Sequence, residues 1–88
     1  MILLMALPTE PVTLNAAQIE ELNQKLSTLR HDVNNHLMLI ATAVELIRLK
    51  PEGTERMLTM MSEQPQKIGT AITLFSGTLE SALHITRS

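Results

Sequence analysis

Apolar residues recur every three or four positions through the first half of the chain, with no glycine or proline from Asn15 to Lys50. Steps of three and four keep side chains on one face of an α-helix, so the pattern predicts one long helix. Asn15 and Gln18 have the spacing of a capping box at its start, and Thr13 is a competing cap.

The apolar row of this helix predicts the seam along which a second helix packs. Its members are Ile19, Leu22, Leu26, Leu29, Val33, Leu37, Ile40, Val44 and Ile47. Their steps alternate as in a heptad repeat, except that the four-residue step to Val33 is followed by another four-residue step to Leu37. The row therefore predicts one insertion in the seam, just after His31.

A second helix is predicted after the sequence KPEGT. Pro51 cannot continue the first helix, Gly53 suits a turn, and Thr54 can cap the next helix. The second apolar row then steps regularly by three and four through Leu58, Met61, Pro65, Ile68, Ile72, Phe75, Leu79 and Ala82. Because the row continues on both sides of Pro65, we expect this proline to disturb the helix locally without ending it.

More apolar residues lie beside both rows than one neighbouring helix can cover. They are Met38, Leu39, Leu46 and Leu49 in the first helix, and Met60, Leu74, Leu83 and Ile85 in or after the second. The predicted fold is therefore all-α: an antiparallel helical hairpin that forms a homodimer, and so a four-helix bundle. We assign residues 14–88 to the hairpin and residues 1–13 to an N-terminal tail or linker.

Composition narrows the possible functions. The 88 residues allow one domain, and the single aromatic residue, Phe75, favours an aliphatic helical core. A formal charge of −2 without a basic stripe argues against a nucleic-acid partner, and the absence of cysteine excludes disulfides and thiolate metal sites. We predict no metal site, because His36 lies about 140° around the helix from His31.

The apolar start, Met1–Leu7, is too short to span a bilayer and lacks the basic region of a signal peptide. A linker remnant, a short strand and a packing tail all remain possible for it. We expect a cytoplasmic location without membrane contact, either for an independent protein or for the cytoplasmic part of a membrane-associated signalling protein.

The sequence LRHDVNNHL, residues 29–37, places polar side chains in the middle of the first helix. His31 lies about 200° from Leu29 and Val33, and so faces away from the seam. Asp32 is its neighbour, and Asn35 lies one turn further along. An exposed imidazole can attack a phosphoryl group, a carboxylate can orient it and take its proton, and an amide can position water. The alternative is a solvated polar face without chemistry.

The sequence HDVNNHL resembles the phosphoacceptor box of bacterial two-component sensor histidine kinases: His, then Asp or Glu, two variable residues, and Asn or Thr. With the hairpin around it, the resemblance covers nearly the whole chain. It implies a dimerization and histidine phosphotransfer domain in which His31 is phosphorylated. It further implies that Asp32 is the general base and that Asn35 helps to place water when the partner response regulator is dephosphorylated.

Two features depart from this family. Many members have a proline five residues after the phosphorylated histidine, where this chain has His36. No glycine-rich nucleotide motif exists among the three glycines, so the chain binds no cofactor itself and has no autokinase activity alone. The resemblance implies that ATP and magnesium are supplied by a separate catalytic domain, in cis or in trans. Its other expected partners are a second copy of the chain and the receiver domain of a response regulator.

Two other functions remain open from the sequence. The chain could be a structural or adaptor hairpin that dimerises as a coiled coil without chemistry. It could also be a membrane-proximal pair of helices that transmits a signal. Phosphorylation of His31 would distinguish the phosphotransfer domain from both of these.

Overall fold

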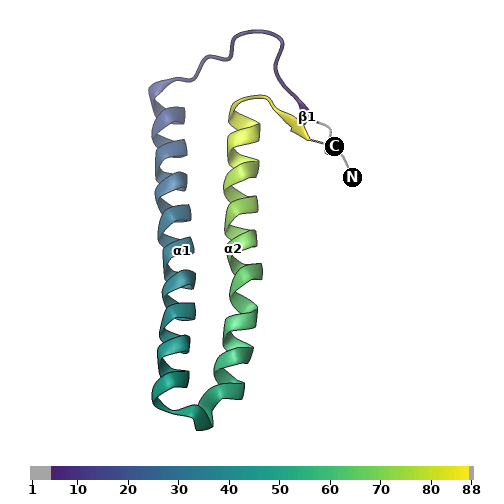
Figure 1. Ribbon diagram of the computed structural model, residues 1–88. Coiled ribbons are helices and arrows are strands. Elements are labelled where there is room, and N and C mark those ends of the chain that lie inside the picture. The colour runs from purple at the N-terminus through teal and green to yellow at the C-terminus, as the bar shows by residue number, and fades with distance from the viewer. Residues whose placement is uncertain (1–4, 88) are drawn as a thin grey trace.

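The computed structural model describes residues 5–87 and consists of two long antiparallel helices side by side (Figure 1). Helix α1 spans Ala16–Leu49, helix α2 spans Thr54–Ala82, and the 3-10 turn η1, Pro51–Gly53, joins them. The predicted helical hairpin is thus confirmed. Its extents are 58 × 34 × 12 Å, and 12 Å is about the diameter of one helix. The hairpin is therefore a single layer in which each long helix has one helical neighbour.

The two helix starts differ in how they are capped. At α1 the predicted capping box is confirmed: the Asn15 side chain accepts from the Gln18 backbone at 2.8 Å, and the Gln18 side chain accepts from the Asn15 backbone at 2.9 Å. At α2 the prediction that Thr54 is the cap is wrong. The η1 turn already holds Thr54 in helical geometry, so its hydroxyl donates back to the Pro51 carbonyl and Gly53 is the cap residue.

The two ends of the described chain meet at the end of the hairpin opposite η1. The N-terminal segment arches over this end, and β1, Met5–Ala6, pairs antiparallel with β2, Thr86–Arg87 (Figure 1). Part of the apolar start is thus a short strand, while Met1–Leu4 lie outside the described residues. In residues 5–87 neither helix has a stretch long and apolar enough to cross a bilayer.

The seam between the helices follows an uninterrupted heptad. On α1 the residues buried or half-buried along it are Leu22, Leu26, Leu29, Val33, His36, Ile40, Ala43 and Ile47. On α2 they are Met57, Met61, Gln64, Ile68, Ala71, Phe75, Thr78 and Ala82. Each set steps alternately by four and three residues, which is the spacing of a regular two-helix interface.

The predicted insertion in the seam is therefore wrong. Leu37, Val44, Leu58 and Ile72, all assigned to the seam from the sequence, are between 42% and 52% exposed. The residue immediately before each one lies in the seam instead, and three of these, His36, Ala43 and Ala71, are smaller or more polar than the residue that follows. A narrow seam between two closely packed helices accepts such residues, and the larger apolar side chains are displaced to its side.

The displaced apolar residues lie on one side of the hairpin. We call Leu37, Val44, Leu58 and Ile72 the Leu37 face; each follows a seam residue directly. Equivalent flanking positions of two antiparallel helices fall on the same side of their common plane, so these four form one surface. The other side carries Asp32, Leu39 and Leu46 from α1 and Leu74 from α2, and we call it the Leu74 face. Both faces contain exposed large apolar residues.

Pro65 lies inside α2, which continues through it as predicted. A proline in a helix interior removes one backbone hydrogen bond and costs about 3 kcal/mol. We expect Pro65→Ala to straighten α2 and to raise the free energy of unfolding by about 1–3 kcal/mol, measured by urea denaturation. The neighbouring exposed substitution Gln66→Ala is the control and should change it by less than about 0.5 kcal/mol. Unchanged curvature and stability in Pro65→Ala would show that the proline has no structural role.

Candidate functional site

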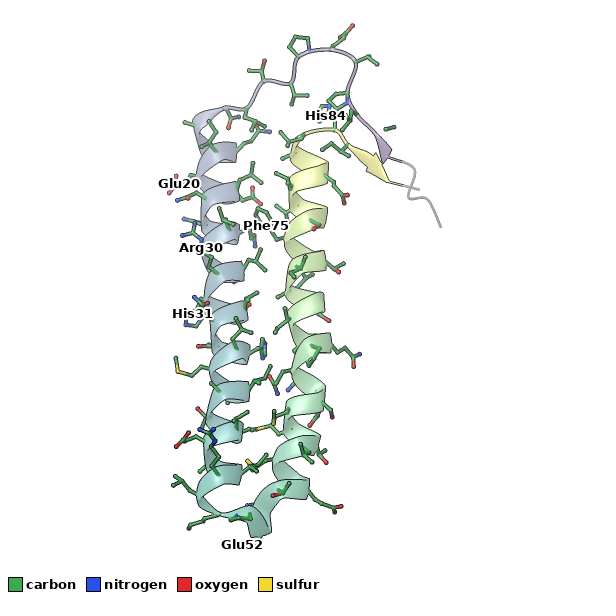
Figure 2. The ribbon with its side chains drawn as sticks, viewed as in Figure 1. Glu20, Arg30, His31, Glu52, Phe75 and His84 are labelled. Carbon is green, nitrogen blue, oxygen red and sulfur yellow. The ribbon has the colours of Figure 1, made fainter. Side chains whose placement is uncertain are left out.

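His31 lies near the middle of α1 on its outer side. Figure 2 shows its ring pointing away from α2, whereas Phe75 points into the space between the helices. The His31 side chain is 74% exposed. Its neighbours two residues away on each side, Leu29 and Val33, lie in the seam, so the ring is directed to solvent by the helical period itself.

Asp32 is the acidic neighbour of His31. Its Oδ1 lies 3.7 Å from Nδ1 of His31, and its side chain is 46% exposed. This distance is too long for a hydrogen bond but short enough for direct electrostatic attraction. A carboxylate on this side of the ring favours the tautomer with the proton on Nδ1, which leaves the lone pair on Nε2. The arrangement therefore presents a nucleophilic nitrogen to an incoming group.

Asn35 is exposed and follows His31 by one helical turn, which places the two Cβ atoms about 5–6 Å apart. The outer stripe of α1 around them is exposed throughout: Gln24, Thr28, His31, Asn35 and Thr42. The three candidate site residues, His31, Asp32 and Asn35, thus share one helix and one surface.

A shallow hollow of about 220 Å³ lies beside Asp32 on the Leu74 face. Helix α2 contributes Leu74, which is 70% exposed, and the half-buried Phe75. The complete lining is Lys25, Thr28, Leu29, Asp32, Ala71, Leu74, Phe75 and Thr78. The candidate site therefore borders a partly apolar surface formed by both helices.

The structure gives His36 a role that the sequence reasoning missed. Its ring is half-buried in the seam, and its Nδ1 lies 2.7 Å from Oε1 of the buried Gln64. The signal for this contact was present in the sequence. Alternating steps of four and three residues from Leu22 reach His36 and not Leu37. The same steps from Met57 on α2 reach Gln64.

In residues 5–87 no three His, Asp or Glu side chains lie close enough together to hold a metal ion. His84 is exposed in the turn after α2, and it adopts a left-handed backbone with φ 57°. Figure 2 places it beneath the N-terminal segment, far from His31.

Comparison with known proteins adds no family to this description. No protein-family model matches the chain, and neither a curated protein nor a solved structure matches it.

Proposed function

We propose that this hairpin is the dimerization and histidine phosphoacceptor domain of a two-component sensor histidine kinase. The observation that carries the proposal is the 74% exposed His31 imidazole with the Asp32 carboxylate 3.7 Å from its Nδ1. His31 stands on the side of α1 opposite the seam, and Asp32 lies between it and the seam, on the Leu74 face. A phosphoryl donor must reach the ring directly, and this position leaves it accessible.

The proposed reaction uses Nε2 of His31 as the nucleophile. Its lone pair forms a bond to phosphorus while the bond from phosphorus to the donor's bridging oxygen breaks and the donor leaves with that electron pair. The ring becomes positively charged, and Asp32 stabilises this charge and accepts the Nδ1 proton. Transfer to a carboxylate of a receiver domain reverses these steps: an oxygen–phosphorus bond forms, the Nε2–phosphorus bond breaks, and the ring regains its proton.

The remaining partners follow from the resemblance to sensor histidine kinases. ATP and magnesium would be bound by a separate kinase domain, which brings the γ-phosphate to His31. Asn35, one turn from His31, would position the water that attacks the phosphorylated receiver. Because ATP and receiver domains occur inside the cell, the proposal places the hairpin in the cytoplasm.

The proposal includes a homodimer formed through the Leu37 face. The single chain exposes 7012 Å², whereas a folded monomer of 9.8 kDa exposes about 5,200 Å². The excess of about 1,800 Å² per chain exceeds the roughly 800 Å² that each partner buries in an interface of standard size, so the chain has surface to spare for one. Asp32 flanks the seam on the opposite side from Leu37, and His31 is at the back of α1. Dimerisation through the Leu37 face would therefore leave the site open.

A pair of substitutions on α2 distinguishes the two faces. Ile72→Glu places a charge on the proposed interface and should convert the dimer to a monomer at micromolar concentration, because burying a charge among apolar side chains is strongly unfavourable. Leu74→Glu, two residues away on the other face, is the matched control and should leave the dimer intact. Light scattering measures both. A wild-type monomer, or dissociation by Leu74→Glu alone, would refute dimerisation through the Leu37 face.

The function itself is tested by offering the hairpin a phosphoryl donor. We would incubate the protein with a phosphorylated receiver domain, and separately with an ATP-bound kinase domain, and map the modified residue by mass spectrometry. The expected product is an acid-labile phosphate on His31. No label with any donor, from a protein that is folded and dimeric, would favour the structural or adaptor hairpin.

A further inference from the structure

A polar contact crosses the seam one and a half turns beyond His31. The Nδ1 of His36 and the Oε1 of Gln64 are 2.7 Å apart, and Gln64 is 2% exposed. The Nε2 of Gln64 also donates to the Met60 carbonyl at 3.0 Å. Only the amino group of the amide can donate to that carbonyl, so Oε1 faces His36 and the imidazole donates from Nδ1. Both polar atoms of the buried Gln64 amide are thereby paired.

This contact differs from the rest of the seam. The other described seam residues are apolar, except Thr78, which carries a hydroxyl group. Aliphatic layers tolerate many alignments of two helices, whereas a buried polar pair is satisfied in one alignment only. If α2 moved by one heptad, Gln64 would lie against Leu29 or Ala43. The buried amide oxygen would then lose its partner, which is costly.

We propose that His36 and Gln64 form a register lock that sets the alignment of α2 against the phosphoacceptor segment of α1. His36 lies about 7.5 Å along α1 from His31. The lock determines which α2 residues share the hollow beside Asp32; in this alignment they are Ala71, Leu74, Phe75 and Thr78. His36 and Gln64 are thus positioning residues for the two-helix surface next to His31. The effect on phosphoryl transfer rests on the proposed function, but the lock itself does not.

The lock is tested by measuring the alignment of the helices with spin labels. The chain contains no cysteine, so Glu45→Cys and Thr73→Cys introduce the only attachment sites, both exposed. Dilution with unlabelled protein isolates the distance within one hairpin. A slip of one heptad moves α2 about 10 Å along α1 and changes the label distance by several ångströms. We expect one distance in the otherwise unchanged protein.

The decisive variant replaces both partners, His36→Leu with Gln64→Leu. It removes the polar pair without leaving an unpaired group, so the helical content should be retained, and a second label distance should appear. The matched control, Ile40→Leu with Met61→Leu, changes an aliphatic layer next to the lock and should keep one distance. A single, unchanged distance in the His36/Gln64 variant would overturn the lock and show that the short η1 turn alone fixes the alignment.

A second measurement needs no seam substitution. In the unchanged protein, nitrogen NMR should show the His36 proton on Nδ1, protected from exchange and coupled across the hydrogen bond to Gln64. A rapidly exchanging ring, or a neutral ring protonated on Nε2 alone, would also overturn the lock.

Phosphoryl transfer provides the functional readout. Labelling of His31 in the His36/Gln64 variant should fall in proportion to the population with the second distance, about twofold if half of the molecules are misaligned. If the unchanged protein itself accepts no phosphoryl group, the proposed function fails, while the label distances still decide the lock. Full labelling in a variant with two distances would show that alignment does not affect the site.

Discussion

His31→Gln is expected to abolish phosphoryl transfer while leaving the fold intact. Glutamine supplies an amide of similar length, but it has no nitrogen lone pair able to attack phosphorus. Since the His31 side chain is 74% exposed, its packing contributes little. The free energy of unfolding should therefore change by less than about 0.5 kcal/mol. Acid-labile label from a phosphorylated receiver measures the first effect, and thermal unfolding by circular dichroism measures the second.

His84→Asn is the matched control for this loss. His84 is the other exposed imidazole, and asparagine tolerates its left-handed backbone. This variant should be labelled at the normal rate. Label that persists in His31→Gln but disappears in His84→Asn would show that His84 is the phosphorylated residue and would refute the proposed site.

Asp32→Asn is expected to slow phosphorylation of His31 by roughly 10²–10⁴-fold. Asparagine keeps the shape of the side chain, but it neither stabilises the positive charge on the ring nor accepts the Nδ1 proton. The initial rate of labelling, measured with saturating donor, reports this step directly. The fold should be unaffected because Asp32 is 46% exposed.

Glu45→Gln is the control for Asp32→Asn. It neutralises another exposed carboxylate, two heptads beyond His31 along the same outer line of α1, and so reproduces the change in net charge alone. We expect it to keep the normal rate. Equal slowing by both substitutions would mean that general electrostatic attraction of the donor, and not proton transfer at Asp32, governs the reaction.

Much of the hairpin was predictable because its signals are local. The capping box at Asn15 and Gln18, the break at Pro51 and the helical period are each set by a few neighbouring residues. The outward direction of His31 is equally local, since it depends only on the residues two positions before and after it. These features required no knowledge of how the helices pack.

The seam was less predictable because its composition is decided by packing. Leu37 and Ile72 are more apolar than His36 and Ala71, so the strongest apolar row in the sequence drifts away from the true contact line. With apolar residues on both sides of the seam, periodicity alone does not tell which row meets the neighbouring helix. The hydrogen bond between His36 and Gln64 connects residues far apart in the chain and appears only once the helices are aligned.

The placement of His31 on a bare helix surface has a consequence for the storage of a phosphoryl group. Its ring stands outside the hollow beside Asp32, with most of its surface in water. A phosphoryl group on Nε2 would be equally open, because no surrounding wall shields the phosphorus–nitrogen bond. Its half-life in the isolated hairpin should approach that of free phosphoimidazole. Protection from hydrolysis, and the choice of the acceptor, would then come from the docked partner and end when that partner leaves.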